Sequence, residues 1–81
     1  MKVYKIFHYG HKTEYVNDKD TAIEKVKAEI IDTINRASDG HWNNQFKIIQ
    51  KNSQIIVKTN FCFKSGYPTT SQKTITILNI A

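Results

Sequence analysis

One segment of the chain, residues 20–37 (DTAIEKVKAEIIDTINRA), has the periodicity of an amphipathic helix. Apolar side chains recur along it at the spacing of one helical face, while a second face carries charges of both signs. The apolar residues are Ile23, Val26, Ile30, Ile34 and Ala37. A lone helix of this kind is stable only when its apolar stripe is buried against another layer. The rest of the chain must therefore supply that layer.

The charged and small residues around this segment predict where the helix begins and ends. Thr21 and Glu24 have the spacing of a capping box, and Asp18 and Asp20 suit the positive N-terminal end. Gly40 is placed to end the helix in a left-handed conformation. We therefore interpret the carboxylates of this region as structural.

Five other segments are rich in β-branched and aromatic residues and are bounded by turn-forming ones. They span residues 2–9, 12–16, 46–51, 54–64 and 72–80. Asn52 and Ser53 predict a tight hairpin, GYPTTS predicts a longer link, and SDGHWNNQ predicts a loop after the helix. The order strand, strand, helix, strand, strand, strand predicts a single α+β domain over residues 1–81. Its expected form is one antiparallel sheet of about five strands with the helix packed on one face.

Charge is distributed unevenly along the chain. All seven carboxylates precede residue 40, where seven basic residues balance them. Residues 41–81 contain five lysines and no acid, and these lysines account for the net charge of +5. This asymmetry indicates an anionic partner. Net charge bears on association and solubility and does not indicate the fold. The alternative is that a small basic protein is simply soluble.

The predicted hairpin turn also predicts which side chains share a face of the sheet. A two-residue turn at 52–53 places Lys51 opposite Gln54, Ile49 opposite Ile56, and Lys47 opposite Lys58. Because side chains alternate along a strand, one face is then apolar and faces the helix. The residues expected on that core face are Phe46, Ile48, Ile55, Val57, Phe61 and Phe63. The other face carries an isoleucine pair surrounded by lysines.

This outer face is the predicted partner-binding surface. Like charges directly opposite each other are mildly destabilising, and exposed isoleucines gain nothing from water, so a partner would compensate for both. The predicted partner-binding residues are Lys47, Ile49, Lys51, Ile56, Lys58, Lys64 and Trp42. Two alternatives stay open: the lysines could instead be solvated edge protection, and Trp42 could plug the open end of the core.

Catalytic and metal-binding motifs are sparse. His8 and His11 flank Gly10, and a metal site would have to add His41 with Asp39 or Cys62, but zinc sites usually combine two closely spaced pairs. A small basic ribonuclease using His8, His11, His41 and Tyr67 is the enzyme alternative. We predict that the protein is not an enzyme and holds no metal or cofactor, with Cys62 as a structural thiol.

In layout the chain, whose segment KTEYVNDKDTAIEKV leads into its one helix, resembles the small anti-CRISPR inhibitors of phages and mobile elements. The resemblance covers the whole chain as an outline: one compact α+β domain, one helix, no catalytic motif and a lopsided charge. It implies stoichiometric inhibition of a host defence complex by docking, without turnover. Many members are acidic mimics of nucleic acid. This chain is basic and would have to grip an acidic protein surface or the nucleic acid of such a complex.

The competing function is direct binding of RNA or single-stranded DNA, in which the lysine face follows phosphates and Tyr4, Tyr67 or Trp42 stack on bases. We expect a cytoplasmic protein, because residues 1–10 lack the apolar run of a signal peptide and no stretch approaches the roughly 20 apolar residues of a membrane span. The exposed edge of so small a sheet makes a homodimer a further possibility.

Overall fold

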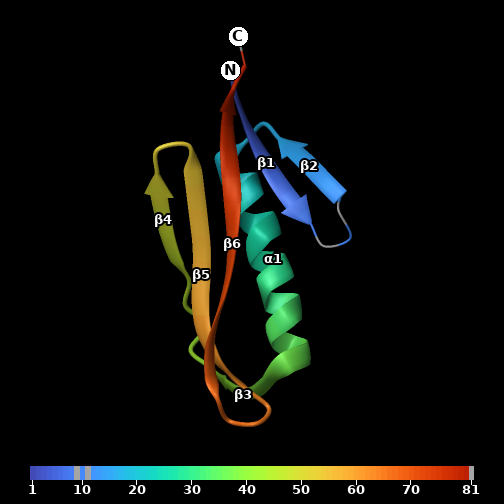
Figure 1. Ribbon diagram of the computed structural model, residues 1–81, viewed down its shortest axis with the longest axis vertical. Helices are drawn as coiled ribbons and strands as arrows, with labels where there is room; N and C mark the ends of the chain where they lie inside the picture. Colours follow the sequence, from blue (N-terminus) through green and yellow to red (C-terminus); the bar gives the residue numbers. More distant parts are fainter. Residues whose placement is uncertain (9, 11, 81) are drawn as a thin grey trace.

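The computed structural model describes residues 1–8, 10 and 12–80 and contains one helix and one antiparallel sheet of six strands among them (Figure 1). The elements are β1 (Lys2–His8), β2 (Lys12–Val16), α1 (Lys19–Ala37), β3 (Ser38–Trp42), β4 (Lys47–Lys51), β5 (Gln54–Phe63) and β6 (Pro68–Asn79). The helix packs on one face of the sheet, so the predicted α+β class is confirmed. The sheet has one strand more than expected.

Helix α1 forms where the apolar period predicted it, but its N-terminal cap is a different residue. Asp18 has an extended backbone, and its carboxylate accepts hydrogen bonds of 2.8 Å from both the N–H and the hydroxyl of Thr21. Thr21 is therefore a donor in the first turn and not the cap itself. The carboxylate satisfies a backbone N–H that has no partner within the helix.

The end of α1 also differs from the prediction. The helix stops at Ala37 because Ser38 is already extended, and β3 follows at once. Residues 38–42 were expected to be loop, yet they pair with β5 through Ser38 opposite Phe63 and Trp42 opposite Phe61. The register shifts between these two pairs, and Gly40, with φ of +100°, lies in the irregular stretch. Its left-handed conformation therefore serves a bulged strand and not a helix end.

The strand order is β2-β1-β6-β5-β3, with β4 also paired to β5. Strand β6 lies at the centre, between β1 and β5 (Figure 1). It begins at Pro68, four residues before the predicted start, because residues 68–71 pair with β5 instead of forming a link. Proline is tolerated there as the first residue of a strand. Both β3 and β4 pair along the same edge of β5, one after the other.

The core lies between α1 and the middle of the sheet. The helix buries Ala22, Ile23, Val26, Ile30 and Ile34 against apolar residues of β1, β5 and β6. Ile55, Val57 and Phe61 are buried as predicted, and Phe46 is partly buried against them. Ile48 and Phe63 are 44% and 41% exposed, so their expected place in the core is wrong. A single helix packs against β1, β2, β5 and β6, and it contributes little cover to β3 and β4 at the other edge of the sheet.

Candidate functional site

The hairpin of β4 and β5 has the register that the sequence predicts. Lys51 lies opposite Gln54, Ile49 opposite Ile56, and Lys47 opposite Lys58. Asn52, in the turn, has φ of +52°, a conformation that asparagine tolerates better than most residues. Since Ile55 and Val57 are buried under α1, the alternating residues of this hairpin lie on the opposite face of the sheet. That face is covered by no element among the described residues.

Strand β1 adds a fourth lysine to this open face. Lys5 pairs with Thr76, Thr76 with Gln54, and Gln54 with Lys51, so the four residues form one row across four strands. Adjacent strands lie about 4.8 Å apart, which places the backbones of Lys5 and Lys51 roughly 14 Å from each other. We call the four open-face lysines, Lys5, Lys47, Lys51 and Lys58, with the isoleucine pair Ile49 and Ile56, the lysine face.

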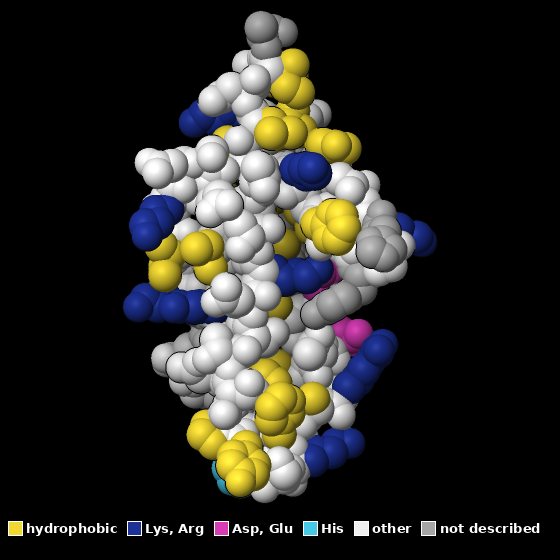
Figure 2. Space-filling view, in the orientation of Figure 1, with side chains coloured by type: hydrophobic (Ala, Val, Ile, Leu, Met, Phe, Trp, Pro, Cys, Tyr) yellow, Lys and Arg dark blue, Asp and Glu magenta, His cyan; other side chains and the backbone are white. Residues whose placement is uncertain are grey.

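No carboxylate lies on the open face of β1, β2, β4, β5 or β6 among the described residues. Glu14 is opposite Ile6, a core residue, and therefore lies on the helix side of β2. Five of the other acids cap or line α1. In the space-filling view, dark blue side chains bracket yellow ones over β4 and β5, and magenta appears only toward the flank of α1 (Figure 2). The four lysines therefore create a field that no neighbouring acid on this face neutralises.

The centre of the open face is polar and uncharged. Because Ile75 and Ile77 face the core, the alternating residues of β6, among them Thr70, Gln72, Thr74 and Thr76, lie on the open side. Threonine is typical of an antiparallel sheet face that is in contact with water. The face is thus built for a hydrated, hydrogen-bonding environment, with apolar atoms only in patches.

Two aromatic side chains lie on the open face beside Lys5. Tyr15 is directly opposite Lys5 and is 59% exposed, and Phe7, two residues farther along β1, is 56% exposed. The aromatics that sequence reasoning chose for stacking lie elsewhere: Tyr4 is buried in the core, and Tyr67 lies in the turn before β6. The alternation Lys5–Ile6–Phe7 in the first strand was the sequence signal that places Lys5 and Phe7 on the same face of the sheet.

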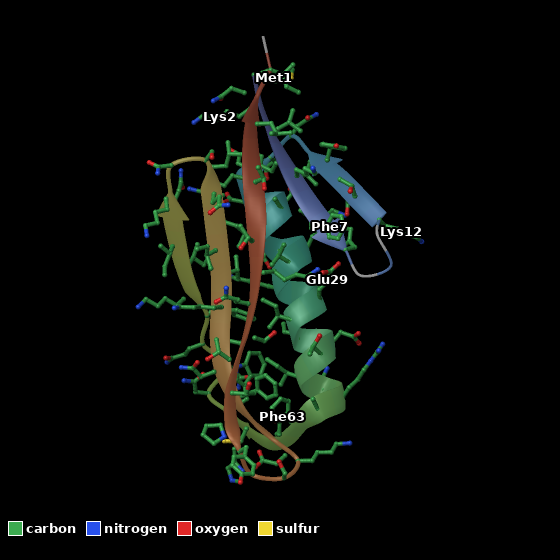
Figure 3. The ribbon with its side chains drawn as sticks, viewed as in Figure 1. Met1, Lys2, Phe7, Lys12, Glu29 and Phe63 are labelled. Atoms are coloured by element: carbon green, nitrogen blue, oxygen red, sulfur yellow. The ribbon has the colours of Figure 1, made fainter. Side chains whose placement is uncertain are left out.

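Trp42 and Lys64 lie apart from the other five predicted binding residues. The Trp42 ring packs against the core and meets Phe46 edge to face at 5.7 Å between centroids, and its Nε1 donates to Thr59 Oγ1 at 2.8 Å. This is the geometry of a core plug. Lys64 lies in the turn between β5 and β6, where its backbone N–H donates to the Ala37 carbonyl. That turn is at the end of the molecule marked by Phe63 in Figure 3.

His8 takes part in an ionic cluster on the helix side of the sheet. Its Nε2 lies 2.9 Å from Glu14 Oε1, and its Nδ1 contacts Glu29 Oε1. Lys73 pairs with the other oxygen of Glu29, and Lys25 pairs with Glu14 at 2.9 Å. The Lys25 ammonium, helped by His8, holds the pKa of Glu14 below its usual value. The cluster ties α1 to β1, β2 and β6, so we assign it a structural role.

The histidine-based sites of the sequence hypotheses do not assemble in the part of the chain that the structure describes. His8 lies on β1, whereas His41 lies on β3 and contacts Asp39 at 3.2 Å. Tyr67 is the residue immediately before β6. It lies roughly 20 Å along the strand direction from Lys73, which shares the ionic cluster of His8. Among described residues no group of three or more His, Cys, Asp or Glu side chains is placed to hold a metal ion. His11 lies outside the described residues.

Comparison of the chain with protein-family models, curated proteins and solved structures finds no match. The geometry of the lysine face is therefore the main indication of function. No helix in the described part of the chain combines the length and the apolar character that crossing a membrane requires.

Proposed function

We propose that this protein is a non-catalytic binding protein whose lysine face holds single-stranded nucleic acid, RNA or DNA. The observation that carries the proposal is the open sheet face with four lysines, two exposed aromatic rings and, among the described residues of β1, β2, β4, β5 and β6, no carboxylate. Lysine ammonium groups bind phosphates, and every base offers a face on which an aromatic ring can stack. The polar centre of β6 fits a hydrated interface of this kind better than a dry protein contact.

The arrangement favours a single strand over a duplex. Tyr15 and Phe7 lie at one side of the face and the pair Lys47 and Lys58 lies across β6 from them. Unpaired bases can stack on the rings while the backbone crosses toward the lysines, whereas the bases of a duplex are already stacked on each other. We therefore expect a homopolymer single strand to bind more tightly than a duplex of the same length.

The test is fluorescence anisotropy with a labelled single-stranded oligonucleotide at several salt concentrations. Four lysine–phosphate contacts predict a slope of log K against log salt of about −3, at roughly −0.7 per contact for a single strand. A duplex competitor measures the preference for single strands. Absence of binding at low salt would overturn the proposal, and binding with a slope near zero would remove the lysines from it.

Docking on an acidic surface of a host defence complex, in the manner of the anti-CRISPR inhibitors, is the second candidate function. Ile49 and Ile56 favour it, because they lie opposite each other at the centre of the lysines and are only partly buried. A protein partner would bury this pair, and its acidic groups would face the lysines.

The two functions separate in a pull-down of the tagged protein from a bacterial lysate with and without nuclease. Recovery of a defined protein complex after nuclease supports docking, and the same complex must then lose activity when the protein is added in equal amount. Loss of all retained material after nuclease supports nucleic-acid binding. The salt series gives a second discriminator, since docking through isoleucines weakens less as salt rises.

A further inference from the structure

A polar cavity of about 310 Å³ lies beside the lysine face. It is at the point along the edge of β5 where the pairing partner changes from β3 to β4. Its lining comes from the segment that joins β3 to β4, from the pair Lys47 and Lys58, and from Asn60 and Thr70. The last two are opposite each other on β5 and β6. The cavity thus continues the lysine face at the end remote from Lys5.

The wall between β3 and β4 is held in place by hydrogen bonds and ring contacts. The Thr59 hydroxyl accepts from Trp42 and donates to the carbonyl oxygen of Gln45, and the Gln45 N–H donates to Asn43 Oδ1 at 3.0 Å. On the helix side, the Lys27 ammonium lies 5.5 Å from the centre of the Phe46 ring. The cavity is therefore preformed, and a ligand would not have to order this segment on binding.

Several of the side chains around the cavity offer hydrogen-bond donors. The Asn60 Oδ1 accepts from Thr70 Oγ1 at 2.7 Å, and the Asn43 Oδ1 accepts from Gln45. With each amide oxygen engaged, each side chain has its NH₂ group as the donor to offer. Lys47 and Lys58 add two ammonium groups, and none of the described residues that line the cavity is a carboxylate. Such a set fits a ligand that only accepts hydrogen bonds and carries more than one negative charge.

We propose that this cavity binds a terminal phosphate monoester, either at the end of a single-stranded nucleic acid held on the lysine face or on a free nucleotide. The inference rests on the proposed function in its first form only. A monoester carries a charge of about −1.5 to −2 near pH 7, and an internal diester carries −1. Lys47 and Lys58 face each other and repel, and a dianion between them removes that repulsion.

The test compares three labelled oligonucleotides of one sequence, with a 5′-phosphate, with a 3′-phosphate and with two hydroxyl ends. We expect one phosphorylated form to bind about tenfold more tightly than the hydroxyl form at pH 7.5. The advantage falls as the pH drops below about 6, where the monoester gains a proton. Asn60→Ala and Asn43→Ala reduce the advantage without changing affinity for the hydroxyl form. Asn35→Ala, an exposed amide on α1, is the matched control and keeps it.

Failure of this proposal is distinguishable from failure of the proposed function. Equal affinity for all three oligonucleotides at both pH values overturns the phosphate site and leaves the lysine face intact. If no oligonucleotide binds, adenosine monophosphate and inorganic phosphate are titrated while backbone and side-chain amide resonances are followed by NMR. Shifts confined to Asn43, Lys47, Lys58 and Asn60 then support a free-nucleotide site. Absence of shifts with both probes overturns it.

Discussion

The indole Nε1 of Trp42 lies 2.8 Å from the Thr59 hydroxyl oxygen, and that hydroxyl donates in turn to the carbonyl of Gln45. One threonine thus links the end of β3 to the segment that leads into β4. Thr59 is the only buried polar residue among those described, and both of its hydrogen bonds are partly buried. This link holds the two short edge strands against β5.

Replacement of Thr59 by valine keeps the shape of the side chain and removes both hydrogen bonds. The Trp42 N–H and the Gln45 carbonyl then lose their partner, and we expect the free energy of unfolding to fall by about 1–3 kcal/mol. Urea denaturation followed by tryptophan fluorescence measures the change. Thr74→Val, exposed on the same sheet, is the control and should stay within about 0.5 kcal/mol of wild type. Equal stability of the two variants would contradict the role of the link.

Reversal of charge at both Lys47 and Lys58 removes two of the four lysines and adds two repulsive charges. We expect affinity for a single-stranded oligonucleotide to fall by at least about tenfold, without unfolding, because both side chains project from the sheet. Anisotropy titration and circular dichroism measure the two effects. Lys2→Glu with Lys64→Glu gives the same net charge away from the lysine face, near the N-terminus (Figure 3) and in the turn between β5 and β6. A matching loss in this control would mean that only total charge matters.

The single substitution Lys58→Glu separates stability from binding. Its carboxylate would face Lys47 directly across the strands, so a repulsive pair becomes an attractive one. We expect the free energy of unfolding to rise by about 0.2–1 kcal/mol while oligonucleotide binding weakens. Urea denaturation and anisotropy on the same sample measure both quantities. A variant that binds as well as wild type would show that the lysine pair has no part in recognition.

Tyr15 tests the stacking component of the proposed interface. Its ring is exposed opposite Lys5, and stacking on an aromatic ring contributes about 1–3 kcal/mol per base. Tyr15→Ala is therefore expected to weaken binding of a single strand by about this free energy. Tyr15→Phe keeps the ring and should restore the affinity. If the alanine and phenylalanine variants bind equally well, the ring does not stack on a base.

Acid pH should destabilise the fold through three carboxylates. Lys25 and His8 lower the pKa of Glu14, the Thr21 N–H lowers the pKa of Asp18, and the His41 N–H lowers the pKa of Asp39. A carboxylate whose pKa is lower in the folded state than in the unfolded state stabilises the fold at every pH above its ordinary pKa. That ordinary pKa is 4.5 for Glu14 and 3.8 for the two aspartates. This stabilisation is lost as the pH falls through the lowered folded pKa.

Thermal unfolding of wild type and Glu14→Gln across pH 7 to 2.5 measures this effect. We expect the midpoint of wild type to fall below about pH 4.5, and the gap between the two proteins to shrink as Glu14 becomes protonated. A gap that stays constant over the whole range would show that the charge of Glu14 contributes nothing. The ion pairs of Lys25 and His8 with this carboxylate would then be surface contacts of no energetic weight.

Local features of the chain were predictable because they depend on neighbours in sequence. The period of Ile23, Val26, Ile30 and Ile34 determined the helix, and the turn at Asn52 determined the pairing of Lys47 with Lys58. Strand β3 was missed because SDGHW has little β-propensity. It becomes a strand only because β5 offers an unpaired edge beside it.

Some residues of the lysine face could likewise be predicted from local sequence, and others could not. Strand alternation and a two-residue turn leave one register, so the hairpin segment alone predicts that one side is shared by Lys47, Ile49, Lys51, Ile56 and Lys58. Pairing between strands that are distant in sequence brings Lys5 and Tyr15 beside them, and the position of the helix leaves Ile48 and Phe63 exposed. Strand order depends on which distant segments bury the most apolar surface together. One helix is also too narrow to cover six strands. Neither the strand order nor the covered area can be predicted from the residue pattern of a single segment.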